Sequence, residues 1–215
     1  MAVNKEITRE KLILAGERLV AIHGVEGMSL RKVGLEAGQK NTSAALFHFG
    51  TKEDLLLAIF DYRMGHVDQR RHDLLDTDDG SIEALVQAWI LPDIEEITSA
   101  TGGSYHAQFL AVVSNHPEFN FQKLWNVRYA SSYKRIAEGL RKLLPELPEK
   151  VFGMRFGMAM MQSIYSIADQ ERLLAVENKH IKDRQTAEPL FVSNLIDVMV
   201  AILTAPLSKQ TRKEL

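Results

Sequence analysis

A run of short polar side chains near the amino terminus has the chemistry needed to contact nucleobases. Lysine can donate to guanine N7 and O6, glutamine or asparagine can pair with adenine, and serine or threonine can serve either base. The run consists of Gln39, Lys40, Asn41, Thr42 and Ser43. None of these side chains needs burial in an apolar core. We expect them on the N-terminal part of a helix that reads the major groove of DNA.

Residues on either side of this run suit contacts to phosphate, which set the position of a protein on DNA. Ser29 and Arg31 stand at the start of the preceding predicted helix. His48, Thr51 and Lys52 stand near the start of the following one, where free backbone amides and the helix dipole favour an anion. Taken singly, the hydroxyl residues are adequately explained as helix caps and the cations as solvated surface charges. The DNA-contact hypothesis therefore depends on their joint spacing.

The elements around these residues have the pattern of a helix-turn-helix. A short helix ends at Gly38, and a third helix is predicted over residues 41–47. Gly34 is small enough to let the two helices cross at close range. A longer first helix, capped by Thr8 and ended by Gly24, is expected to brace the pair.

Residues 8–60, and chiefly the segment SLRKVGLEAGQKNTSAALFHFGTKEDLL, resemble the N-terminal domain of the TetR family of transcriptional regulators. The run FHFGTKEDL is the most specific part. One extra residue separates Gly38 from Phe49, and Leu46 and Phe47 occupy positions where the family often carries tyrosines that reach phosphate. Leu46 can instead contact a thymine methyl group. We expect Phe47 and Phe49 to belong to the core.

The resemblance implies an all-helical homodimer that represses, or less often activates, transcription from a pseudo-palindromic operator in double-stranded DNA. It also implies release of the DNA by a small molecule bound in the C-terminal body. We therefore expect a cytoplasmic regulator, associated with the nucleoid of a bacterium. The expected division is a helix-turn-helix domain over residues 1–54 and a helical effector-binding and dimerisation domain over 55–215, linked by a fourth helix over about 52–75.

The rest of the chain also has the periodicity and the caps of helices, which predicts an all-α fold. No internal repeat of 20–50 residues interrupts this pattern. The further helices are predicted over residues 81–91, 105–114, 121–144, 151–177 and 189–205.

Two helices of the body have surfaces suited to a second copy of the chain. A pair of glycines one turn apart permits close helix approach. The last helix is apolar on two sides, so one side can dock on the body and the other on a partner in a four-helix bundle. The alternative is burial of this helix wholly within its own domain. The predicted interface residues are Gly153, Gly157, Phe191, Leu195, Val198, Met199 and Ile202.

Large or adaptable side chains on the middle helices are candidates for a ligand pocket. Methionine fits irregular cavities, and tyrosine or tryptophan adds one polar group to an apolar wall. Ordinary core packing is the alternative for each. No cluster of Arg or Lys marks an anionic ligand here, so we expect a mainly apolar effector. The candidates are Trp89, Tyr105, Phe109, Trp125, Tyr129, Met158, Met161 and Tyr165.

Composition argues against several other classes of protein. The 215 residues include no cysteine, which excludes disulfides and cysteine catalysis. The seven histidines lack the spacing of a helical zinc site, and no phosphate-binding glycine loop or nucleophile elbow occurs. We therefore expect no metal, no cofactor and no enzymatic activity. A constitutive DNA-binding regulator without an effector, or a helical module that binds small molecules or proteins, remain the alternatives.

Charge and hydropathy add to this interpretation. Residues 1–52 carry eight Lys or Arg and five Asp or Glu, a net charge of +3, against −2 for the whole chain. A small basic module joined to an acidic body is typical of a DNA reader attached to another domain. The most apolar stretch, residues 189–205, contains Asp197 and is shorter than the ~18 residues of a membrane span, so we expect no membrane partner.

Overall fold

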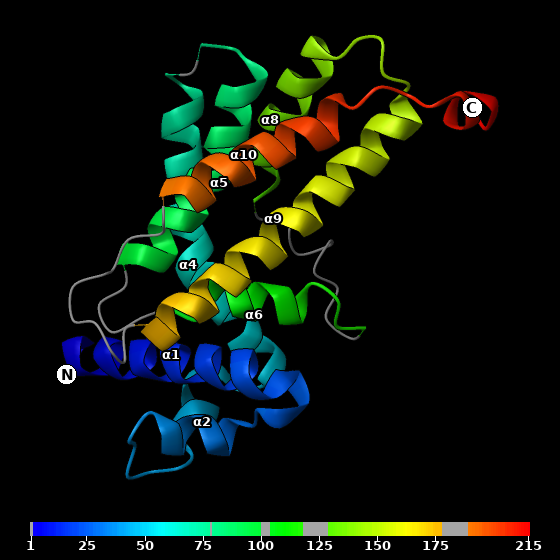
Figure 1. The fold of residues 1–215 in the computed structure, drawn as a ribbon. Helices are drawn as coiled ribbons and strands as arrows, with labels where there is room; N and C mark the ends of the chain where they lie inside the picture. Colours follow the sequence, from blue (N-terminus) through cyan, green and yellow to red (C-terminus); the bar gives the residue numbers. More distant parts are fainter. Residues whose placement is uncertain (1, 78, 100–103, 118–128, 178–188) are drawn as a thin grey trace.

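The computed structural model describes residues 2–77, 79–99, 104–117, 129–177 and 189–215 (Figure 1). These residues form helices and contain no strand, which confirms the predicted all-α fold. The helices are α1 (Ala2–Gly27), α2 (Leu30–Glu36), α3 (Ala44–Phe49), α4 (Lys52–Leu75), α5 (Ile82–Ser99), α6 (His106–Val113), α8 (Ala130–Leu143), α9 (Glu149–Glu177), α10 (Pro189–Thr204) and α11 (Lys209–Lys213).

The first helix differs from the prediction at its start. α1 begins at Ala2 and not after a cap at Thr8, because residues 2–7 contain no glycine or proline that would stop the helix from extending. Its regular part ends where predicted. Gly24 takes a φ of 72°, in the left-handed region that glycine reaches at little cost, and one further turn leads to Gly27.

The helix-turn-helix pair forms with a later start of its second helix than predicted. α2 is followed by a tight turn at Gly38, whose φ is 66°. α3 begins at Ala44 instead of residue 41, because the Asn41 side chain accepts the backbone N–H of Ser43 at 3.0 Å and holds a turn there. The five polar residues of the predicted reading helix therefore lie in the turn before α3.

The fourth helix has the predicted bounds and joins the two ends of the molecule. α1 packs closely on it at Gly16, where a Cβ atom would lie 2.9 Å from Ile59 Cδ1. α4 contacts α1 and α3 and, further along, α5 and α8. A single hydrophobic cluster runs from Leu12 on α1 to Leu203 on α10. The division predicted after residue 54 falls in the first turn of α4 and stays a prediction.

The helices of the body enclose the rest of this core. α5 continues through Pro92 to Ser99, beyond its predicted end near residue 91, because Ile94 and Ile97 are buried in the core past the proline. α6 packs on α1 and on α9, and α10 lies across α9 and α5 (Figure 1). Of the helix predicted over 121–144, residues 121–128 lie outside the described residues, and α8 covers most of the remainder.

Candidate DNA-binding face and effector cavity

The predicted DNA-contact residues lie together on α2, the turn before α3, α3 itself and the start of α4. Figure 1 shows α2 at one end of the molecule and α8 and the C-terminus at the opposite end. Gly34 is the crossing point of the pair, since a Cβ atom there would lie 3.1 Å from the backbone oxygen of Thr42. A side chain at residue 34 would therefore push the polar turn away from α2.

The turn before α3, residues 39–43, contains one cation, Lys40. Lys40 is exposed, and so is Arg31 on α2, and neither has a hydrogen bond or ion pair with any residue that the structure describes. Gln39 is half-buried and donates from Nε2 to the backbone oxygen of Ala37 at 3.3 Å. Thr42 is half-buried as well. The turn thus presents one free ammonium group among short amide and hydroxyl side chains.

Two of the predicted phosphate contacts act as helix caps. Ser29 Oγ accepts the backbone N–H of Lys32 at 3.3 Å, and Thr51 Oγ1 accepts that of Asp54 at 3.0 Å. Thr51 also donates to the Asp54 carboxylate at 2.7 Å. Lys52 Nζ lies 3.7 Å from a carboxylate oxygen of Glu26. The capping interpretation of both hydroxyl residues is therefore confirmed, and their contact with phosphate stays a prediction.

The two aromatic residues of α3 have opposite environments. Phe49 is buried, as predicted, and packs with Ala45 against α1 and α4. Phe47 is 77% exposed, so the prediction that it belongs to the core is wrong. Ala45 and Phe49 are four residues apart and share the inward face of the helix, which turns residue 47 outward. Leu46 is also exposed, at 55%.

Two cations of α1 join this face, and the sequence interpretation missed them. Lys5 Nζ lies 5.4 Å from the ring centroid of Phe47, and the Arg9 guanidinium lies 5.3 Å from that of Phe49. Burial, together with the positive charges of Lys5 and Arg9, lowers the pKa of His48 below its ordinary value. Lys5 and Arg9 are four residues apart and therefore share one face of α1. This spacing is the sequence signal that could have placed the two cations together.

A buried ionic cluster connects the candidate DNA-binding face, formed by α1, α2, the turn before α3 and α3, to the body. The carboxylate of Glu17 on α1 accepts from Arg63 on α4 at 2.9 and 3.2 Å, and from the backbone N–H of Tyr105 at 3.1 Å. Arg63 also donates to Glu96 on α5 at 2.7 Å. Burial opposes the charge of Arg63, but Glu17 and Glu96 outweigh it and raise the pKa of the guanidinium. Tyr105 directly precedes α6, so this cluster joins four elements.

A second polar cluster lies deeper in the body. Arg71 on α4 is fully buried, donates to the Asp93 carboxylate at 2.6 Å and lies 4.4 Å from the centroid of the Tyr133 ring. His106, at the start of α6, places Nε2 3.8 Å from the same carboxylate. Although burial works against its charge, Arg71 and His106 hold the pKa of Asp93 below its usual range. Glu171 on α9 accepts the backbone N–H of Gln108 at 2.9 Å, and burial raises its pKa.

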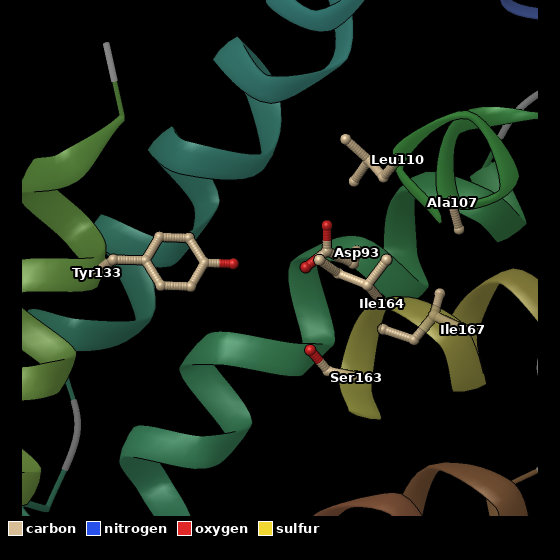
Figure 2. Close-up of a pocket in the computed structure, with 7 residues that line it drawn as sticks. All are labelled: Asp93, Ala107, Leu110, Tyr133, Ser163, Ile164 and Ile167. Atoms are coloured by element: carbon tan, nitrogen blue, oxygen red, sulfur yellow. The ribbon is translucent and has the colours of Figure 1, made fainter. Parts of the chain in front are cut away.

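A small cavity lies beside this cluster, between α5, α6, α8 and α9. Figure 2 shows the Tyr133 hydroxyl pointing toward Asp93, and the aliphatic side chains of Leu110, Ile164 and Ile167 lie opposite Tyr133. The cavity volume is about 10 Å³, room for roughly one water molecule. Its lining residues are Asp93, Ala107, Leu110, Tyr133, Ser163, Ile164 and Ile167. Within the described ranges, no group of three or more histidine or carboxylate side chains is arranged to hold a metal ion.

The family model of the tetracyclin repressor-like C-terminal domain matches residues 87–204, more than half of the chain. The chain belongs to the TetR family. This match covers helices of the body, whereas the resemblance noted above concerned residues 8–60. The two indications are therefore independent, and they agree.

Solved structures of transcriptional regulators share the fold. A protein of Shewanella sp. PV-4 assigned to the family is 18% identical, with a TM-score of 0.57, over 91% of this chain and 95% of its own. The fatty acid degradation regulator FadR of Bacillus halodurans is 14% identical, with a TM-score of 0.61, over 92% and 99%. No curated protein matches the sequence. At these identities the likeness concerns the fold alone.

Of the residues predicted to line the ligand pocket, none that the structure describes lines the cavity beside Asp93, and these residues differ in their environments. Trp89 and Phe109 are buried in the core, and Trp89 packs on Tyr133 and Phe156. Met158 and Tyr165 are 58% and 45% exposed on α9. Tyr105 contacts Arg18, and the Tyr129 hydroxyl donates to Asp61 at 3.1 Å. Met161 is half-buried, and Trp125 lies outside the described residues.

The residues predicted for dimerisation divide between the core and the surface. Leu195 and Met199 are buried within the single chain, against α9 and α5. Val198 is 36% exposed, while Phe191 and Ile202 are half-buried. On α9, Gly153 and Gly157 are exposed, and a Cβ atom on either would meet nothing within 4 Å.

This apolar surface includes a segment that is long and apolar enough to cross a membrane by length and composition alone. The segment is Pro189–Lys213, with a mean hydropathy of 1.9. α10 has 16 residues, however, and spans about 24 Å at 1.5 Å per residue. That is short of the roughly 30 Å hydrocarbon core of a bilayer.

Proposed function

We propose that this TetR-family chain is a homodimeric, sequence-specific DNA-binding regulator in the bacterial cytoplasm, and a binding protein rather than an enzyme. In this proposal it represses transcription and leaves its operator when a small, mainly apolar ligand enters the body. The observation that carries the proposal is the crossing of α2 and the turn before α3 at Gly34, which presents the unpaired Lys40 at the end of the molecule. A helix-turn-helix uses this arrangement to reach base edges.

The proposed division of labour on DNA follows from exposure and charge. Residues 39–43 form the turn before α3 and Leu46 is exposed on α3, and we assign base contacts in the major groove to them. Ser29, Arg31, His48, Thr51 and Lys52 flank this group and are assigned to phosphate. Domain 1–54 would thus read DNA, and domain 55–215 would regulate the reading.

Dimerisation is supported by the exposed apolar surface of α9 and α10. Met154 and Met158 on α9 are more than half exposed, as is Leu190 on α10. Two neighbouring helices with exposed apolar stripes pair well with the same two helices of a second chain, because a two-fold axis makes one surface its own partner. The dimer would place two reading helices about 34–36 Å apart, on successive major grooves.

Ligand release is supported by the position of α6. Ala107 and Leu110 of α6 line the cavity, while α6 also packs on α1 of the DNA-binding face. Ligand pockets usually measure several hundred cubic ångströms, so a ligand must open this cavity of about 10 Å³. Movement of α6 would strain the Tyr105–Glu17 hydrogen bond and disturb α1. Coupling of this kind is typically worth about 1–3 kcal/mol.

Selection of bound sequences from random DNA tests the central claim. The purified chain is expected to enrich one pseudo-palindromic sequence at a fixed salt concentration, which matters because phosphate contacts make affinity salt-dependent. Repeating the selection with candidate apolar metabolites is expected to lose that enrichment for one of them. Enrichment of no sequence, with equal binding to scrambled duplexes, would refute sequence-specific regulation.

A constitutive regulator without an effector is the second candidate, and the close packing of α5, α6, α8 and α9 beside Asp93, which leaves only about 10 Å³ there, favours it. Thermal unfolding with a library of metabolites separates the two candidates, because a ligand that binds only the folded state raises the Tm. A ligand that raises the Tm and lowers operator affinity supports the first candidate. Operator binding that no metabolite changes, with a constant Tm, supports the second.

A further inference from the structure

Phe47 stands out on the DNA-binding face because a large apolar ring is held in solvent. It is 77% exposed, more than any other large apolar side chain among the described residues, and its neighbour Leu46 is 55% exposed. Burying such side chains would stabilise the fold by about 1.5–3 kcal/mol each, yet the inward face of α3 is filled by Ala45 and Phe49. Exposure of the ring at this position therefore does not stabilise the fold.

The Phe47 ring is also held in place. Lys5 Nζ from α1 lies 5.4 Å from its centroid, and the His48 ring meets it edge to face with centroids 5.6 Å apart. These contacts restrict the ring before any partner arrives, which lowers the entropy cost of binding. Because Lys5, Arg31 and Lys40 are all exposed on this surface, the exposed ring indicates an anionic partner that also offers an apolar group.

Thymine offers the apolar group that such a ring can recognise in DNA. Its 5-methyl group lies in the major groove, where the other base edges present hydrogen-bond donors and acceptors. The Phe47 ring has no hydroxyl group and cannot pair with phosphate or with a base edge. The Lys5 ammonium, 5.4 Å from the ring centroid, is a group that can pair with phosphate.

We propose that Phe47, with Leu46 beside it, reads thymine methyl groups in each operator half-site, and that Lys5 neutralises the adjacent phosphate. The proposal rests on the DNA-binding function proposed above. It adds an apolar, thymine-selective contact to the polar reading by the turn before α3. Phe47 then acts as a specificity residue and Lys5 as a positioning residue.

Replacement of thymine by deoxyuridine gives a direct test, because it removes only the 5-methyl group. After the operator has been selected, each thymine of both half-sites is replaced in turn, and affinities are measured at fixed salt. The wild-type chain is expected to lose about fourfold in affinity at the contacted positions, the equivalent of one methyl group. F47A is expected to bind the thymine operator more weakly and to show no further loss with deoxyuridine at the positions that Phe47 contacts.

Two variants separate this contact from general effects. L35A removes from α2 a leucine that is about as exposed as Leu46, at 57% against 55%, and is expected to keep the full deoxyuridine penalty. K5A is expected to reduce the slope of log K against log salt by about 0.9, the value for one phosphate contact, and to keep the penalty too. Circular dichroism and the Tm establish that each variant is folded.

The outcomes distinguish this inference from the proposed function. If specific binding occurs but no deoxyuridine substitution weakens it, the thymine reading is wrong and the DNA-binding function stands. If the penalty persists at every position in both F47A and L46A, another residue reads the methyl groups and the inference is also wrong. If selection enriches no sequence, the proposed function itself fails.

Discussion

Glu17 and Arg63 form a two-point ion pair between α1 and α4, with Oε2 2.9 Å from Nε and Oε1 3.2 Å from Nη2. Both residues are buried, and Glu17 is 1% exposed. Removing one partner of a buried pair leaves a charge without compensation, at a cost of about 3–5 kcal/mol. We expect Glu17→Gln to lower the free energy of unfolding toward the lower end of this range, because Glu96 still pairs with Arg63. Urea denaturation monitored by circular dichroism measures the change.

The same helix provides a matched control for this prediction. Arg70 on α4 pairs with Glu95 on α5 through the same two kinds of contact, at 2.9 and 3.2 Å, but both side chains are nearly half exposed. Exposed pairs contribute about 0–1 kcal/mol. Glu95→Gln is therefore expected to lower the free energy of unfolding by less than about 1 kcal/mol. Equal effects of the two substitutions would show that burial does not decide the energy of the Glu17 pair.

Lys40 tests whether the turn before α3 reads bases. Lys40→Ala is expected to weaken binding to the selected operator by about 1–3 kcal/mol and to relax the preference at one base pair. Lys142 on α8 is exposed at the opposite end of the molecule, and Lys142→Ala is expected to leave affinity unchanged. A loss that is equal for all sequences would make Lys40 a phosphate contact only. Fluorescence anisotropy with operator and scrambled duplexes makes the distinction.

Gly157 tests the proposed dimer without damage to the single chain. A Cβ atom at this exposed helical position meets nothing within 4 Å, and glutamate favours a helix more than glycine does. Gly157→Glu is therefore expected to fold normally but to place two like charges at the two-fold interface. Sedimentation analysis should show a monomer with much weaker operator binding. A stable dimer of this variant would place the interface elsewhere, and Leu143→Glu on α8 is the control.

His48 gives a pH dependence whose sign can be worked out. Its pKa in the free chain lies below the ordinary value of about 6.5, so the free chain holds this side chain neutral at pH 7. A nearby phosphate would raise the pKa, so the complex takes up a proton and affinity is expected to rise as pH falls from 8 toward 6. Affinity of His48→Gln should depend less on pH. Identical pH profiles would remove His48 from the phosphate contacts.

Parts of the fold followed from the sequence because they depend on local signals. Gly24, Gly38 and the cap at Thr51 were placed correctly, since φ preferences and capping act within a few residues. The outward position of Phe47 was missed because it depends on which face of a six-residue helix meets α1 and α4. The early start of α1 was missed because a weak cap signal at Thr8 competed with uninterrupted helix formers.

The interior of the body could not be predicted in the same way. Arg71, Asp93 and His106 lie far apart in sequence and meet only when α4, α5 and α6 pack together. Aromatic and methionine residues suggested a pocket, but the same residue types fill cores and surfaces, as Trp89 and Met158 do here. Composition alone does not distinguish these environments, since burial is set by contacts between helices.

Gly65 provides a test of stability that is independent of any ligand. It lies in the middle of α4, and a Cβ atom there would meet nothing within 4 Å. Gly65→Ala is expected to stabilise the chain by up to about 1 kcal/mol, because alanine loses less backbone entropy in a helix. Gly34→Ala is the contrast, since its Cβ would press on the Thr42 backbone oxygen at 3.1 Å. Scanning calorimetry should show a higher Tm for the first variant only.

The continuity of α4 has a mechanical consequence. Its 24 residues form one rod about 36 Å long, with the Thr51 cap at one tip and the contacts to α5 and α8 toward the other. A tilt of about 5° at the buried end of such a rod would carry the far tip through about 3 Å. In the proposed dimer, two copies tilting in opposite senses would double the error in groove spacing, so a modest internal rearrangement would suffice to misalign the two reading helices on DNA.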